Sequence, residues 1–92
     1  MITIGTQNRQ AATIVTYPNP ATNEIRVTIP ASWQGKKVTY ELIGNNGQVN
    51  KRTIAAFASQ TESININSLA PGFYIARVIC NGETAQQKII KR

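Results

Sequence analysis

This chain contains no histidine and no aspartate, and Cys80 is its only cysteine. These absences exclude a Ser-His-Asp triad, a Cys-His pair and a histidine-ligated metal site built from the chain's own residues. One cysteine also excludes an internal disulfide and a zinc cluster. Because no histidine is present to activate the thiol, we interpret Cys80 as a small buried residue rather than a nucleophile.

Acidic residues are also scarce, because the chain has only four glutamates. They fall on four separate segments, and each looks like a residue of a solvent-exposed face. Their spacing therefore singles out no pair of carboxylates for general acid and base catalysis. The four are Glu24, Glu41, Glu62 and Glu83.

Long apolar stretches are missing as well. No segment approaches the ~20 apolar residues that a membrane-spanning helix needs. Residues 1–10 also lack the apolar core of a signal peptide. If the protein is exported, we expect its signal peptide to lie upstream of Met1.

Basic residues, in contrast, are abundant. Ten lysines and arginines give a net charge of +6 and a pI near 10.0, which favours contact with anionic partners. Six of them form three short pairs on separate segments and the others stand singly, so there is no basic run and we interpret the charges mainly as solubilising. The pairs are Lys36-Lys37, Lys51-Arg52 and Lys91-Arg92.

Binding to nucleic acid requires aromatic residues that alternate with cations along one surface. The best juxtaposition here is Phe73, Ile75 and Arg77 on one face of an expected strand, where one aromatic lies beside one cation. The sequence therefore predicts no nucleic-acid partner.

The apolar residues follow a period of two, which is typical of half-buried β-strands. About seven short strands predict an all-β fold, an immunoglobulin-like antiparallel β-sandwich, with a partly open oligonucleotide-binding barrel as the alternative. We expect residues 14–92 to form this domain and residues 1–13 to be a linker, with an extra edge strand at 2–5 as an option. The expected strands are 13–17, 24–29, 38–42, 48–54, 64–66, 73–80 and 83–91.

Several turn and loop residues have expected structural roles. Asn45-Asn46-Gly47 and Asn81-Gly82 predict hairpin turns, the second of the primed type. In Pro71-Gly72, proline fixes φ and glycine adopts a conformation that other residues resist. We expect Leu69 to pack into the end of the core. We expect Trp33 to close one open end of the sandwich rather than to anchor a partner.

Three stretches in a fixed order go beyond this generic pattern. They are VTYPNPATNEIRVTI at residues 15–29, YELIGNNGQV at 40–49 and INSLAPGFYIARVICNGETAQQKIIKR at 66–92. In this order and spacing the chain resembles the C-terminal sorting domain of the type IX (Por) secretion system of Bacteroidetes. The resemblance covers residues 15–92 and rests on the ordered set, because each piece alone is common.

The motifs of that family can be assigned to individual positions. The opening motif falls on Tyr17, Pro18, Asn19 and Pro20, and the central glycine on Gly47. The late motif falls on Leu69, Gly72, Tyr74 and Val78, and the hairpin glycine on Gly82. The terminal segment is Lys88, Ile89, Ile90, Lys91 and Arg92. The resemblance implies that the secretion machinery recognises the late and terminal residues.

The resemblance also implies a recognition module that is not an enzyme and needs no cofactor or metal. Such domains pass through the periplasm and engage the type IX machinery at the outer membrane, which delivers the cargo to the cell surface or the exterior. In many members a sortase-like protease then removes the domain and joins the cargo to anionic lipopolysaccharide. We expect this cleavage N-terminal to the sandwich, within residues 7–13.

Exposed sheet edges and the excess of basic residues are the two features by which a partner would recognise the domain. Exposed sheet edges invite strand addition by a partner, and the surplus of cations would speed encounter with an acidic receptor. An edge strand would also allow a dimer. The alternative function is a generic immunoglobulin-like adhesion or carbohydrate-binding module.

Overall fold

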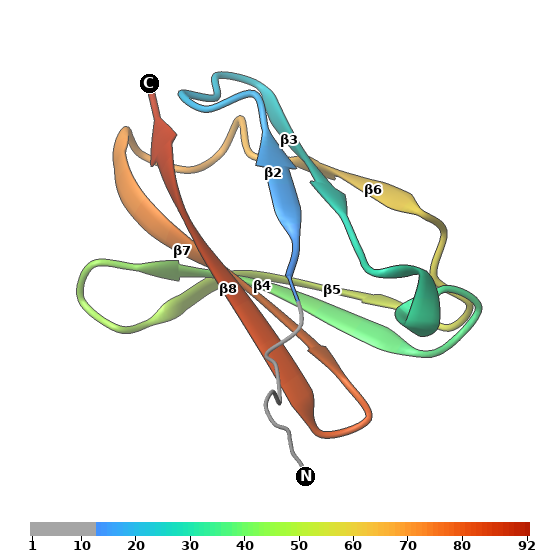
Figure 1. The fold of residues 1–92 in the computed structure, drawn as a ribbon. Coiled ribbons are helices and arrows are strands. Elements are labelled where there is room, and N and C mark those ends of the chain that lie inside the picture. Colours follow the sequence, from blue (N-terminus) through green and yellow to red (C-terminus); the bar gives the residue numbers. More distant parts are fainter. Residues whose placement is uncertain (1–12) are drawn as a thin grey trace, which may run out of the picture.

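A computed structural model of the chain describes residues 13–92 (Figure 1). In these residues seven strands form two antiparallel sheets with the orders β2-β3-β6 and β5-β4-β7-β8. This confirms the predicted all-β, immunoglobulin-like sandwich. The predicted linker at 1–13 falls almost wholly outside the described residues, as does the optional strand at 2–5. The strands are β2 (Val15–Tyr17), β3 (Glu24–Thr28), β4 (Val38–Gly44), β5 (Val49–Ala55), β6 (Thr61–Asn65), β7 (Gly72–Cys80) and β8 (Glu83–Lys91).

The strand bounds agree with the sequence pattern to within two residues, except at β6. The alternation of apolar residues predicts that this strand begins at residue 64, but it begins at Thr61. Thr61, Glu62 and Ser63 pair with β3 although their side chains are polar. Pairing along a sheet edge needs only backbone groups, so the pattern of apolar residues underestimates the length of such a strand.

The core lies between the two sheets, and alternation along each strand supplies its side chains. On β4, for example, Val38, Tyr40 and Leu42 are fully buried, as predicted. Cys80 at the end of β7 is buried with them, which confirms its interpretation as a packing residue. The Tyr40 hydroxyl has no hydrogen-bond partner in the described part of the chain, and burial raises the pKa of this residue to about 12.

Trp33 closes one end of the sandwich, as the sequence predicts. It lies in a short 3-10 helix, η1 (Ala31–Trp33), and is only 1% exposed. Its indole Nε1 donates a hydrogen bond to the Glu83 carboxylate at the start of β8, with an N···O distance of 2.8 Å. The indole therefore joins the loop after β3 to the opposite sheet.

The last two strands form a tight hairpin of the predicted primed type. Asn81 and Gly82 both have positive φ, at 51° and 82°, which matches the right-handed twist of the flanking strands. All nine residue pairs from Gly72↔Lys91 to Cys80↔Glu83 are in register. The terminal segment is thus one regular hairpin, and its two faces are fixed by this register.

Candidate functional site

The loop after β2 contacts the end of the terminal strand (Figure 1). Asn19 Nδ2 donates to the carbonyl of Lys88 at 3.2 Å, and Asn19 Oδ1 accepts from the amide of Ile90 at 3.0 Å. Ala21 continues the pattern, because its amide donates to the Ile90 carbonyl and its carbonyl accepts from the Arg92 amide, both at 2.8 Å. We call these four hydrogen bonds the terminal contact.

The terminal contact occupies the outer edge of β8 over its last residues. The amide and carbonyl of Ile90 both point away from β7, and both are used by the loop after β2. An incoming strand at this end would therefore have to displace Asn19 and Ala21 before it could pair by backbone hydrogen bonds. The opening and terminal motifs, separated by some 70 positions in sequence, form one structural unit.

Part of the late motif builds the corner that leads into β7. The Tyr74 side chain is buried, and its hydroxyl donates to the carbonyl of Ala70 four residues upstream. This is the tyrosine corner found in immunoglobulin-like sandwiches. Gly72 has φ of +152°, a conformation that a side chain resists. Leu69 packs against the core, as the sequence predicts.

The outer face of the four-stranded sheet carries four cross-strand rows that follow from the pairing register. Two rows at one end are largely apolar, a third is charged, and the fourth is mixed. In order, the rows are Ile90-Phe73, Lys88-Ile75-Ile43-Val49, Gln86-Arg77-Glu41-Arg52 and Thr84-Ile79-Thr39-Ile54.

The apolar patch consists of Ile43, Val49, Phe73, Ile75 and Ile90 in the first two rows. Phe73 is 52% exposed, Val49 39% and Ile90 37%, whereas both other members are half-buried. Apolar side chains clustered in this way on a surface mark interaction sites more often than scattered ones do.

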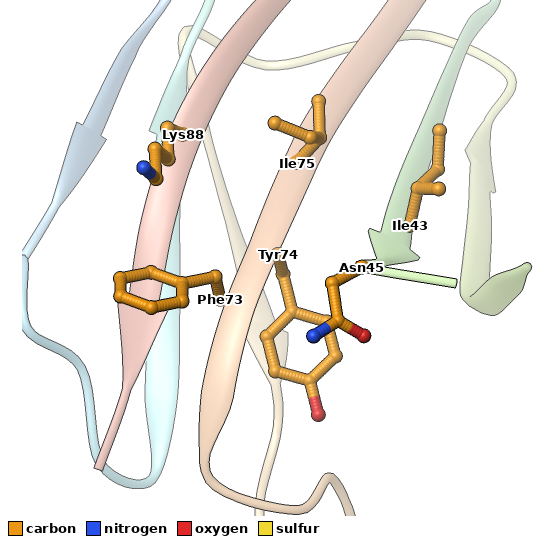
Figure 2. Close-up of a pocket in the computed structure, with 6 residues that line it drawn as sticks. All are labelled: Ile43, Asn45, Phe73, Tyr74, Ile75 and Lys88. Atoms are coloured by element: carbon orange, nitrogen blue, oxygen red, sulfur yellow. The ribbon is translucent and has the colours of Figure 1, made fainter. Parts of the chain in front are cut away.

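A pocket of about 310 Å³ opens in this patch (Figure 2). Ile43 and Ile75 line it, and the ring of Phe73 and the side chain of Asn45 lie at its lower end in the view. Lys88 lies above Phe73 in the view, across the pocket from Ile43. Its ammonium group is 4.8 Å from the centroid of the Phe73 ring, within the range of a cation–π interaction. The pocket thus combines an apolar floor with one cation.

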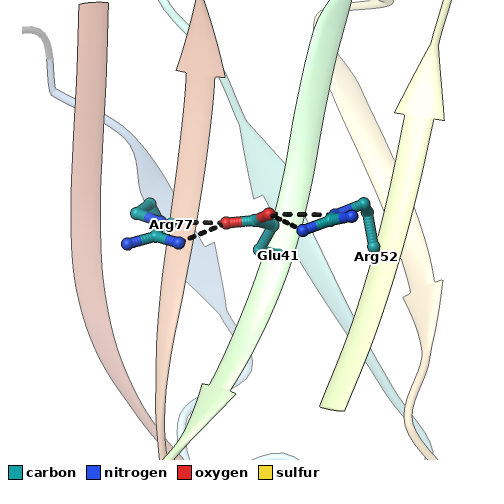
Figure 3. A network of polar contacts seen from close by, with 3 residues as sticks. All are labelled: Glu41, Arg52 and Arg77. Carbon is teal, nitrogen blue, oxygen red and sulfur yellow. Dashed lines mark hydrogen bonds and ion pairs between the residues drawn. The ribbon is translucent and has the colours of Figure 1, made fainter. Parts of the chain in front are cut away.

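The third row contains a buried carboxylate, contrary to the expectation that all four glutamates face solvent. Glu41 is only 5% exposed because Arg52 and Arg77 cover it from both neighbouring strands (Figure 3). Its oxygens lie 2.7 Å from a guanidinium nitrogen of each arginine. The hydrogen bonds from Arg77, and then those from Arg52, hold the pKa of Glu41 below its usual range against the opposing effect of burial. The missed signal was the pairing of an acid with bases on both adjacent strands.

The structure places the residues of the family motifs in different surroundings. Tyr74, Val78 and Ile89 belong to the core, whereas Lys88, Ile90 and Arg92 are exposed near the end of β8. The tips of the two hairpins contain Gly47 and Gly82. Around the pocket, sequence reasoning missed Ile43 and the connection of Phe73 to Lys88, because both depend on cross-strand register.

The described residues give no indication of a metal site or a membrane-spanning helix. Residues 13–92 contain no group of three or more His, Cys, Asp or Glu side chains that could hold a metal ion. Over the same range, no helix is long and apolar enough to cross a membrane.

A protein-family model matches most of the chain. The family model described as "Secretion system C-terminal sorting domain" matches residues 15–92. No curated protein matches the chain. The matched range contains both motifs of the terminal contact and the whole sandwich.

Proposed function

Because the chain belongs to the family of secretion-system C-terminal sorting domains, which carry the sorting signal of the type IX system, we propose that it acts as the sorting signal of a cargo protein. It would catalyse no reaction itself. Its cargo would enter the periplasm on a separate signal peptide. The type IX machinery at the outer membrane would then recognise the domain and pass the cargo to the cell surface or the exterior.

The observation that carries this proposal is the match to the family over residues 15–92. The terminal contact supports it, because it fixes the exposed end of the last hairpin against the body of the domain. A receptor that recognises Lys88, Ile90 and Arg92 would then meet a preformed surface and avoid the entropic cost of ordering a free tail.

We further propose that a sortase-like protease cuts the chain N-terminal to the sandwich, within residues 7–13, after translocation. The chain would be the substrate of that reaction. The tight antiparallel pairing of both sheets supports a cut outside the strands, because proteases favour exposed segments over hydrogen-bonded ones.

A secretion assay tests the sorting function. The full chain is fused to a reporter enzyme with a periplasmic signal peptide and expressed in a bacterium with a type IX system. We expect the reporter in the medium or on the cell surface. The same fusion in a strain without that system should remain in the periplasm, as should the reporter alone. Equal secretion by both strains would contradict the proposal.

Deletion of residues 88–92 tests the role of the terminal segment in the same assay. We expect secretion to stop, because the exposed end of the hairpin is removed. The deletion also removes the buried side chain of Ile89, so the purified variant is compared with the intact chain by circular dichroism. Secretion that survives the deletion would remove the terminal strand from the signal.

A further inference from the structure

The apolar patch offers a surface that a partner can reach without unpairing any strand. The edge of β8 near its end is occupied by the terminal contact, so strand addition there has to break four hydrogen bonds. The outer face beside the same residues presents Phe73 and Ile90 directly. Recognition of this end of the hairpin therefore favours a partner that lies across the face.

The charges on this face favour an acidic partner. The four rows contain three cations and one carboxylate, and both arginines are bonded to that carboxylate. Lys88 forms no ion pair within residues 13–92, and its ammonium group lies at the pocket over the Phe73 ring. A carboxylate beside the pocket would gain a charge-assisted hydrogen bond there.

The size of the pocket limits what can fill it. At about 310 Å³ it is at the lower end of the range for ligand pockets, and it suits one or two apolar side chains. An anionic lipid surface calls for a cluster of four or more basic residues, whereas in the four rows of this face Lys88 is the one cation without an ion pair within residues 13–92. A second copy of the chain would bring another Lys88 and another net charge of +6 to the contact, which electrostatic repulsion disfavours.

We propose that the apolar patch binds an extended segment of a partner protein in which a large apolar side chain is flanked by a carboxylate. The apolar side chain fills the pocket between Phe73 and Ile43, and the carboxylate bonds to the Lys88 ammonium group. This inference rests on the proposed sorting function, for which the partner is a component of the secretion machinery.

Secretion of matched surface variants tests the role of the patch in the full fusion protein. Phe73→Thr and Lys88→Glu are expected to lower the secreted fraction about tenfold, as loss of a central aromatic or charged contact does at an interface. The matched controls are Ile54→Thr, which is equally exposed on the same face but in the fourth row, and Lys36→Glu in a loop. Both controls should be secreted like the parent.

The outcomes of this assay separate the patch from the sorting function. If the parent is secreted and Phe73→Thr is secreted equally well, the patch is not the docking surface and the inference fails alone. If the parent itself is not secreted, the sorting proposal fails. Thermal unfolding of each purified variant is measured in parallel. A folded Phe73→Thr or Lys88→Glu protein that is retained supports the inference, and retention that follows only from unfolding overturns it.

Binding of defined peptides tests the chemistry of the partner. The ¹⁵N-labelled chain is titrated with the acetylated, amidated peptides EVEFEV and KVKFKV. We expect the acidic peptide to shift the amide signals of Ile43, Phe73 and Ile75, and Lys88→Glu to reverse the preference between the two peptides. No shift with either peptide, or equal shifts with both, would overturn the assignment.

The other occupants give distinct results. Lys88-dependent binding to phosphatidylglycerol vesicles in the absence of peptide shifts would assign the patch to a lipid and overturn the proposal. A dimer in sedimentation that Phe73→Thr converts to a monomer would assign it to a second copy, with the same consequence.

Discussion

At the scale of single residues, the pair of arginines around Glu41 is the feature with the clearest energetic consequence. The carboxylate is almost fully buried, whereas Arg77 and Arg52 are partly exposed, at 34% and 56% of their side-chain surface. Solvent therefore screens part of the attraction. Removal of the carboxylate leaves two guanidinium groups close together but still able to reach water.

We predict that Glu41→Gln lowers the free energy of unfolding by about 1–2 kcal/mol at neutral pH, below the range for fully buried pairs because of this screening. Because the folded pKa of Glu41 is lowered, its contribution is present above the unfolded pKa of about 4.3 and is lost as the pH falls below that value. Urea unfolding of the parent and of Glu41→Gln at neutral and acidic pH measures this difference in the free energy of unfolding.

The control for this prediction is Glu24→Gln. Within residues 13–92 Glu24 pairs only with Arg26, at 3.0 Å, and both side chains are about half exposed, so the expected effect is below about 0.5 kcal/mol. A difference between the parent and Glu41→Gln that persists unchanged in acid would contradict the electrostatic explanation.

At the scale of secondary-structure elements, the end of β8 is held by a loop in place of a neighbouring strand. The Asn19 side chain supplies one acceptor and one donor to β8, as a strand backbone would, and Ala21 supplies two backbone groups. Asparagine suits this role because its amide carries both kinds of group on a short side chain. The prolines on either side, Pro18 and Pro20, remove two amides that would otherwise need partners.

We predict that Asn19→Ala opens the end of β8 without unfolding the domain. The Ile90 amide loses its acceptor, so its hydrogen exchange should accelerate about tenfold. This corresponds to a decrease of about 1.4 kcal/mol in the free energy of local opening. The amide of Val78 in the middle of β7 should exchange as before. Asn67→Ala, at another exposed asparagine, is the control, and unchanged protection of Ile90 in Asn19→Ala would show that the terminal contact does not hold the strand.

At the scale of the whole molecule, two sheets share one core, and residues in the loops also connect one sheet to the other. Trp33 is one of them, because it is buried at the end of the sandwich and bonded to Glu83 on the opposite sheet. A domain of this size buries only about two-thirds of the surface that its unfolded chain exposes. A single large side chain is therefore a substantial part of its stability.

We predict that Trp33→Ala lowers the free energy of unfolding by about 3–5 kcal/mol, the usual cost of truncating a buried aromatic residue. Phe57→Ala provides the contrast, because Phe57 is 83% exposed and its loss should cost less than about 0.5 kcal/mol. Equal effects of the two substitutions in urea unfolding would contradict the closing role of Trp33.

Some features followed from local sequence patterns. Alternation along residues 38–42 gave the buried face of β4, and Asn81-Gly82 gave the turn of the last hairpin, because each depends on neighbours in the sequence. The start of β6 did not follow, because pairing through its backbone leaves no hydrophobic signal. Burial of Glu41 did not follow either, because its partners lie 11 and 36 residues away.

The sequence by itself determined the all-β class, the absence of a histidine-based or disulfide-based site, and the ordered motifs of the family. Those depend on composition and on spacing along the chain. Only the tertiary structure decided which motif residues are exposed, that Asn19 holds the end of β8, and that Phe73 and Lys88 meet at one pocket. The physical reason is that cross-strand register and loop contacts join residues far apart in sequence, and no local pattern records those pairings.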